Sequence, residues 1–196
     1  TYPQLEIILH EVQTKVMLNK LSEGTLDAGI LATPIEITGL EEIILYTEPF
    51  YVATNKQHPF ASKLSIKKED LRGETLLLLE EGHCLRGQAL DVCSDTMTKE
   101  RKDFRGTSLE TIRHMVSAGI GITLIPQTAI DYKNLIKNSS IKYIPFNEPA
   151  PARRVGLLFR ETYTRKVCFQ KLAVSIHSIT QKEFSTKKAV QVISVK

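Results

Sequence analysis

Residues Leu76 to Cys93, LLLLEEGHCLRGQALDVC, form the stretch from which the fold is predicted. Four consecutive leucines are typical of a short buried strand, and the Glu-Glu-Gly run that follows ends it at Gly82. From Leu85 onward apolar residues recur at helical spacing, which predicts a helix. Cys84 is therefore expected at the strand-to-helix turn, and Cys93 nine residues further on.

The spacing of the two cysteines has a physical consequence. In one continuous helix the α-carbons of Cys84 and Cys93 would be roughly 13.5 Å apart. A disulfide requires α-carbons within about 7 Å, so these thiols can pair only if the segment between them unwinds. A thiol at a helix start, beside His83 and two residues before Arg86, is also where a thiolate is favoured. The pattern is that of a redox switch.

A structural interpretation of the same residues is also open. Buried free cysteines are common and behave as small hydrophobic residues, and two cysteines on a helix are more often part of a core than chemically active. His83 would then cap the helix and Arg86 would be solvated. The coincidence of Gly82, His83 and Cys84 at one turn favours the reactive interpretation over either cysteine taken alone.

Composition limits the class of protein. The 196 residues are 42% hydrophobic and 24% charged with a net charge of +4, which indicates one globular domain or two small lobes and no dedicated nucleic-acid surface. Three cysteines do not form a secreted disulfide framework. Without a signal peptide or a long apolar run, the chain is predicted to be cytoplasmic with no membrane partner, and any disulfide to be transient or sensory. Because it starts at Thr1 without a methionine, we expect a fragment.

The first thirty residues predict a strand–helix–strand unit. Strands are expected at Leu5–Leu9 and Leu26–Ala32, with a helix at Thr14–Glu23 that Gly24 ends. Such a βαβ unit implies a parallel sheet. Thr14 lies at the carboxyl end of the first strand, where ligands bind in such sheets. On position alone its hydroxyl is more often a helix cap.

The rest of the chain predicts an α/β protein with two lobes. Crossings near Thr47–Glu48 and Arg153–Arg154 would leave 1–47 and 154–196 in lobe I and 48–153 in lobe II. This is the plan of periplasmic binding proteins, whose ligand lies between the lobes. Three further expectations complete the chain: a loose polar segment at Asp95–Asp103, a helix capped by Thr107 with Glu110 in a capping box, and a terminal helix at Tyr163–Ile179 with Cys168 in the core.

Four motifs resemble the regulatory domain of the LysR-type transcription regulators, and among them the members that sense peroxide. They are EGHCLR at 81–86 with Cys93 following, FRGTSLET at 104–111, SAGIGITLIP at 117–126 and LEIILHEVQT at 5–14. The resemblance covers nearly the whole chain. It implies two Rossmann-like lobes joined by two crossover strands, as in type II periplasmic binding proteins. The first strand and helix of lobe I and the DNA-binding winged helix-turn-helix domain would be absent from this chain.

The resemblance also implies roles for particular residues. Cys84 would be the peroxidatic cysteine, oxidised by hydrogen peroxide to sulfenic acid, and Cys93 the resolving cysteine that forms a disulfide with it. Other matches to the peroxide pocket are Thr14, Gly82, His83 and Arg153, although the alignment at the last position also admits Arg154. Gly87 replaces the aspartate that the family carries three residues after the reactive cysteine.

The implied biology is that of a transcription activator of antioxidant genes. The full-length protein would form a homodimer or homotetramer, bind promoter DNA and RNA polymerase, and be reset by a thiol reductant such as glutaredoxin or thioredoxin. No cofactor and no metal are expected. Two other functions stay open: a LysR-type domain that binds a small organic inducer between the lobes, and a thiol peroxidase-like enzyme. A zinc hydrolase using His83, Cys84 and Cys93 fails on spacing, since ligands along one helix cannot converge.

Overall fold

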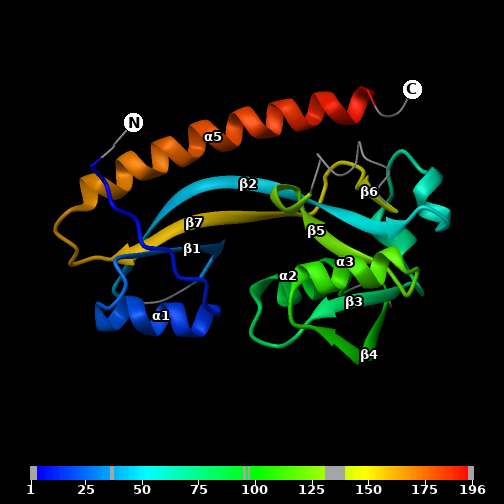
Figure 1. Cartoon of the computed structure of the whole chain (residues 1–196), viewed down its shortest axis with the longest axis horizontal. Helices are drawn as coiled ribbons and strands as arrows, with labels where there is room; N and C mark the ends of the chain where they lie inside the picture. The colour runs from blue at the N-terminus through cyan, green and yellow to red at the C-terminus, as the bar shows by residue number, and fades with distance from the viewer. Residues whose placement is uncertain (1–3, 36–37, 95, 97, 131–139, 194–196) are drawn as a thin grey trace.

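The computed structural model describes residues 4–35, 38–94, 96, 98–130 and 140–193. Two long antiparallel strands, β2 (Leu40–Asn55) and β7 (Ala152–Arg160), run along the middle of the molecule (Figure 1). The first part of β2 pairs with β7, and its last part pairs with β5 (Thr123–Pro126) and β6 (Ile141–Pro145). One strand therefore takes part in both ends of a curled antiparallel sheet.

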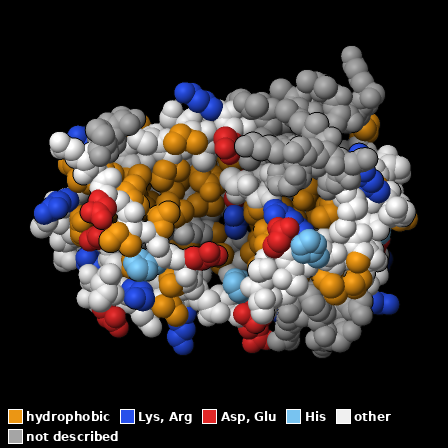
Figure 2. Space-filling view, in the orientation of Figure 1, with side chains coloured by type: hydrophobic (Ala, Val, Ile, Leu, Met, Phe, Trp, Pro, Cys, Tyr) orange, Lys and Arg blue, Asp and Glu red, His pale blue; other side chains and the backbone are white. Residues whose placement is uncertain are grey.

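At one end, helices cover both faces of the sheet formed by β1 (Ala28–Thr33), β7 and β2. Helix α1 (Thr14–Glu23) packs Leu21 against Leu31 and Leu158, and Gly24 closes it in the left-handed conformation. Helix α5 (Lys166–Ile193) covers the opposite face. Alternate β7 residues point to the two helices, as a strand period of two requires. Hydrophobic side chains also gather on this end of the face drawn in Figure 2.

At the other end, β3 (Thr75–Leu79) lies between two apolar clusters and pairs in parallel with β4 (Lys99–Gly106). Leu76 and Leu78 pack on the side of α2 (Cys84–Cys93), whereas Leu77 and Leu79 pack on the side of α3 (Leu109–Ser117). The run of four leucines arises because both faces of this strand are buried. Three short 3-10 helices complete this end: Pro59–Ser62, Lys68–Leu71 and Gln127–Ala129.

The predicted first strand is wrong. Leu5–Leu9 forms no strand, and Leu9 is 88% exposed. The predicted parallel βαβ unit fails with it, since β1 pairs antiparallel with β7. An apolar run becomes a strand only where a neighbouring edge accepts its backbone hydrogen bonds, and residues 5–13 pair with no described strand.

Three smaller predictions also need correction. Most of the supposedly loose segment Asp95–Asp103 is ordered, because β4 begins at Lys99 and pairs with β3; residues 95 and 97 lie outside the described part. The cap of α3 is Ser108, whose hydroxyl accepts from the Thr111 N–H, and not Thr107. Cys168 is exposed on α5 instead of buried in the core.

The helices at Thr14–Glu23 and Cys84–Cys93 are confirmed, and so is the mixed α/β class. The crossing expected near Thr47–Glu48 lies within one continuous strand, β2. The division of the chain into lobe I (1–47 and 154–196) and lobe II (48–153) stays a prediction.

Candidate functional site

The candidate site is a surface hollow of about 410 Å³ between the starts of α1 and α2. It brings together four of the residues singled out from the sequence, Thr14 from α1 and Gly82, His83 and Cys84 from the turn before α2. Gly87 also lines it, at the position of the family aspartate. The complete lining is Thr14, Glu81, Gly82, His83, Cys84, Arg86, Gly87 and Leu90.

Two helix N-termini meet at this hollow. Thr14 is the first residue of α1 and Cys84 the first residue of α2. The residues that precede them, Gln13 and His83, have extended backbones and make no side-chain capping bond, and neither helix has an acidic residue in its first turn. The partial positive charge of both helix ends is thus left uncompensated by a capping side chain and favours an anion such as a thiolate.

Gly82 allows the turn before Cys84 to approach α1. Its φ of +96° lies in the region that favours glycine. A Cβ at this position would lie 2.9 Å from the Gln13 Oε1 atom, the far end of an exposed side chain that would have to move aside. His83 is half-buried beside this contact, with Nε2 3.8 Å from the Glu80 Oε1. The glycine therefore has a steric reason to stand next to the reactive turn.

The two cysteines of α2 have different surroundings. Cys84 is an exposed free thiol, whereas Cys93 is a buried free thiol within the apolar cluster on the α2 side of β3. Burial raises the pKa of the Cys93 thiol, and bonds from the Thr98 and Thr96 side chains act against that rise. Cys93 therefore stays a neutral thiol at physiological pH, which makes it a poor first nucleophile.

Arg86 has a structural contact that the sequence did not indicate. Its guanidinium lies 2.9 Å from the Glu100 Oε1 of β4 and donates to the Leu79 carbonyl of β3 at 3.4 Å. The Arg86 and Glu100 side chains are 12% and 21% exposed, so neither is simply solvated. This partly buried ion pair joins α2 to the strands beneath it.

Arg153 and Arg154 are neighbours at the crossover, but their side chains bond to different partners. Arg153 Nε donates to the Glu48 Oε1 at 2.8 Å, and Nη1 donates to the Gln88 Oε1 of α2 at 3.4 Å. Arg154 Nε instead donates to the Thr33 hydroxyl at 3.0 Å. Neither arginine lines the hollow, but Arg153 is the one bonded to α2.

Sequence reasoning missed Glu48 and Gln88. A signal for Gln88 was present, because it lies four residues after Cys84 and so on the same helix face. No comparable signal marked Glu48, whose burial depends on Arg153, 105 positions away in the sequence.

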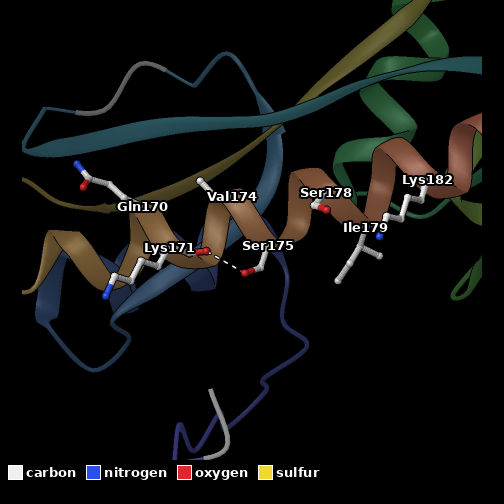
Figure 3. A pocket seen from close by; sticks show the side chains of 7 residues that line it. All are labelled: Gln170, Lys171, Val174, Ser175, Ser178, Ile179 and Lys182. Carbon is white, nitrogen blue, oxygen red and sulfur yellow. Dashed lines mark hydrogen bonds between the residues drawn. The ribbon is translucent and has the colours of Figure 1, made fainter. Parts of the chain in front are cut away.

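Two other hollows are less suited to chemistry. One follows the outer face of α5, where Figure 3 shows every lining side chain on that helix and the Ser175 hydroxyl bonded to the Lys171 carbonyl. It has no His, Cys, Asp or Glu in its lining. The other lies between α5 and β2, where His177 Nδ1 is 2.9 Å from the Leu45 carbonyl oxygen. Of these three hollows, the one at α1 and α2 is lined by a thiol.

Among the residues that the structure describes, no three His, Cys, Asp or Glu side chains are grouped as metal ligands would be. None of the described helices is both long and apolar enough to cross a bilayer.

Comparisons with known proteins agree with the fold. The DNA-binding transcriptional dual regulator OxyR of Escherichia coli is 41% identical over 178 residues, which are 91% of this chain and 58% of that protein. The hydrogen peroxide-inducible genes activator of Haemophilus influenzae is 37% identical over 175 residues, 89% of this chain and 58% of that protein. The chain thus spans a little over half the length of these curated relatives.

Solved structures give the same result. The crystal structure of the oxidised form of OxyR superposes with a TM-score of 0.81 at 40% identity, covering 93% of this chain and 85% of that one. The reduced OxyR regulatory domain from Pseudomonas aeruginosa has a TM-score of 0.81 at 36% identity, with coverages of 91% and 83%. Residues 1–173 match the family described as LysR substrate binding domain. The chain therefore belongs to the LysR substrate-binding domain family.

Proposed function

We propose that this chain is the hydrogen peroxide-sensing regulatory domain of a LysR-type transcription activator, with Cys84 as the peroxidatic and Cys93 as the resolving cysteine. One observation carries the proposal. An exposed thiol stands where two helix N-termini meet, and a buried thiol ends the same ten-residue helix. The curated relatives are named as hydrogen peroxide-inducible activators, which supports the same stimulus for this chain.

The chemistry balances with these two residues and peroxide. The Cys84 thiolate attacks one peroxide oxygen, the O–O bond breaks, and hydroxide leaves and takes up a proton to become water. Cys84 is then a sulfenic acid. The Cys93 thiol attacks its sulfur, a second water leaves, and a disulfide forms. Peroxide takes up two electrons in total, one pair from the two thiols.

The neighbouring residues have supporting roles. The Thr14 hydroxyl can donate to and accept from peroxide within the hollow, and His83 lies beside the thiol. Gly82 brings the turn close enough for α1 and α2 to share the hollow. Arg153 acts from further away, through its positive charge next to α2. The family pattern has an aspartate three residues after the reactive cysteine, whereas this chain has Gly87, so that position carries no acidic side chain.

Helix α2 has few fully buried residues, which suits a segment that must unwind, although Leu85 and Val92 pack partly against the apolar clusters. Of its ten residues only Ala89 and Cys93 are buried. Moving one small side chain out of the core costs on the order of 1–2 kcal/mol, which disulfide formation can offset. The contacts of Arg86 and Gln88 are lost at the same time. Unwinding thus has a modest and local cost.

The role of the whole protein is part of the proposal. In the cytoplasm, a homodimer or homotetramer would change its subunit arrangement when the disulfide forms and thereby change its contacts with promoter DNA and RNA polymerase. Glutaredoxin or thioredoxin would reduce the disulfide and reset the sensor. No cofactor or metal has a part in this scheme.

Single-cysteine variants test the proposal. Rapid mixing with hydrogen peroxide should show a fast reaction in the parent, none in Cys84→Ser, and a trapped sulfenic acid in Cys93→Ser. Cys168→Ser is the matched control, because that thiol is exposed but lies on α5, and it should behave as the parent. Equal rates in the parent, Cys84→Ser and Cys93→Ser would refute the assigned roles. Steady turnover with a thiol reductant would favour a peroxidase, and tight binding of an organic inducer without thiol oxidation would favour the inducer-binding alternative.

A further inference from the structure

Glu48 is a buried carboxylate at the crossover of β2 and β7. Its side chain is 0% exposed. One carboxylate oxygen accepts from the Arg153 Nε at 2.8 Å, and the other accepts from the Thr128 backbone N–H at 2.7 Å. A carboxylate in this position largely neutralises the guanidinium beside it.

Gln88 connects this ion pair to the helix that carries the reactive cysteine. Its Oε1 accepts from the Arg153 Nη1 at 3.4 Å. Gln88 follows Cys84 by one helical turn on the same face of α2, a rise of about 6 Å along the axis. The charge of Arg153 is therefore held against α2 at Gln88, and the charge of Glu48 is bonded to the same guanidinium.

We propose that Glu48 moderates the reactivity of Cys84 by neutralising the Arg153 guanidinium that Gln88 holds beside α2. This inference rests on the proposed function and adds a residue that tunes it. Glu48 does not line the hollow, so it acts as a positioning residue through Arg153. The charges of Glu48 and Arg153 also affect a second group, Tyr46. Burial is the largest cause that raises the pKa of the Tyr46 hydroxyl; Glu48 raises this pKa further, and Arg153 lowers it.

The other charged groups around Cys84 stay in place when Glu48 is altered. Glu81, His83 and Arg86 line the same hollow. Arg86 is paired with Glu100 of β4, and His83 lies near Glu80. The polar contacts described for Glu48 are with Arg153 and the Thr128 backbone N–H. A change in Cys84 after substitution of Glu48 thus reports the crossover pair.

The test is the pH profile of Cys84 alkylation by iodoacetamide, with each cysteine followed by peptide mass spectrometry. Glu48→Gln leaves the guanidinium uncompensated, so the midpoint should fall by roughly half to one pH unit. Below the midpoint the rate should rise about threefold, because the larger thiolate fraction is partly offset by lower nucleophilicity. Glu48→Asp keeps the charge and should restore most of the parental profile.

Glu42→Gln is the matched control. Glu42 is on the same strand, but it accepts from the Thr33 hydroxyl and lies beside Arg154, away from Gln88. Its midpoint should equal that of the parent. An unchanged or higher midpoint in folded Glu48→Gln, or the same shift in Glu42→Gln, would overturn the inference. A purely structural role for Glu48 predicts slower alkylation or general thiol exposure instead of a lower midpoint.

A second comparison decides the matter even if Glu48→Gln fails to fold. Arg153→Gln should raise the midpoint, and Glu48→Gln/Arg153→Gln, which buries no charge, should bring it back toward the parent. Equal midpoints in these two variants would overturn the inference. The alkylation needs no peroxide. If the parent fails to react rapidly with peroxide, the proposed function fails while the midpoint shift can still stand, and the reverse outcome rejects only the role of Glu48.

Discussion

The ion pair between Arg86 and Glu100 should set how easily the disulfide forms. It joins α2 to β4 at 2.9 Å, and Arg86 also bonds to the Leu79 carbonyl of β3. Cys84 and Cys93 can approach within disulfide distance only if the helix between them unwinds. Unwinding would break the bonds of Arg86 to Glu100 and to the Leu79 carbonyl. The pair therefore stabilises the dithiol form alone. Replacing Arg86 by methionine keeps much of the apolar stem and removes the charge.

The size of the effect follows from the burial of the pair. A charge-assisted hydrogen bond contributes about 1.5–3 kcal/mol when buried, and desolvation of two partly buried charges reduces that contribution. With side chains 12% and 21% exposed, we expect Arg86→Met to destabilise the dithiol form by about 1–2 kcal/mol. For a two-electron couple 1.4 kcal/mol corresponds to about 30 mV. The reduction potential of the Cys84–Cys93 disulfide should become more negative by about 20–45 mV.

The assay is equilibration in buffers of reduced and oxidised dithiothreitol, followed by acid trapping and mass spectrometry of the peptides. Lys63→Met is the control, because Lys63 forms an exposed ion pair with Asp70 at 3.2 Å that does not touch α2. Its potential should match that of the parent. A potential for Arg86→Met that is unchanged or less negative would refute the reasoning, because it would mean that the pair survives disulfide formation.

Three further outcomes are expected. Gly87→Ala, at a helical position where a Cβ meets no atom within 4 Å, should stabilise α2 by up to about 1 kcal/mol. The disulfide potential should then become less negative by about 10–20 mV in the same titration, and a shift in the opposite direction would contradict the unwinding of α2. Gly82→Ala should lower the free energy of unfolding in urea by about 1–2 kcal/mol, from backbone strain and the contact with Gln13. Gly73→Ala shares the positive φ without the contact, so an equal loss in both variants would show that Gln13 is unimportant. Finally, the raised pKa of the buried Cys93 thiol means that the unfolded chain binds fewer protons once the pH exceeds the unfolded value of about 8.5. Stability should be complete below that pH and be lost as the pH rises from the unfolded value through the raised pKa of the folded state. Cys93→Ala should show a weaker fall, and parallel curves for the parent and the variant would exclude this cause.

Local patterns predicted the elements whose determinants are local. Helix α1 has the predicted bounds because apolar spacing defines it and Gly24 ends it in the left-handed conformation. The turn at Gly82 and the helix from Cys84 to Cys93 follow from the leucine run and the periodicity after it. The placement of the two thiols at opposite ends of one helix therefore follows from the local sequence alone. The apolar periodicity of a helix can be recognised without knowing which segment the helix packs against.

Strands and buried charges depend on partners that are remote in the chain. Leu5–Leu9 has a strand-like pattern but pairs with no described strand. Glu48 looks like an ordinary exposed glutamate until Arg153 comes opposite it in the β2–β7 register. The structural interpretation left Arg86 solvated, but β4 places Glu100 in front of it. Cys168 has apolar neighbours in sequence, yet it faces away from the sheet that α5 covers.

The candidate site combines residues that local patterns identify with residues that only the fold brings together. Cys84 and Cys93 were identified from spacing, whereas the contribution of Thr14 came from the family resemblance, because 70 positions separate it from Cys84 in the chain. The structure brings Thr14 and Cys84 to one hollow through two helix starts. The positive φ of Gly82 favours a glycine at this position, and the contact with the Gln13 side chain was absent from any local pattern.

The most direct test of the redox switch is the product formed with one equivalent of hydrogen peroxide. The parent protein should be treated, its remaining thiols blocked, and its peptides analysed by mass spectrometry without reduction. The account predicts a Cys84–Cys93 linked peptide as the main product, with Cys168 recovered as a blocked thiol. Recovery of unmodified Cys84, or a link that excludes Cys93, would contradict it.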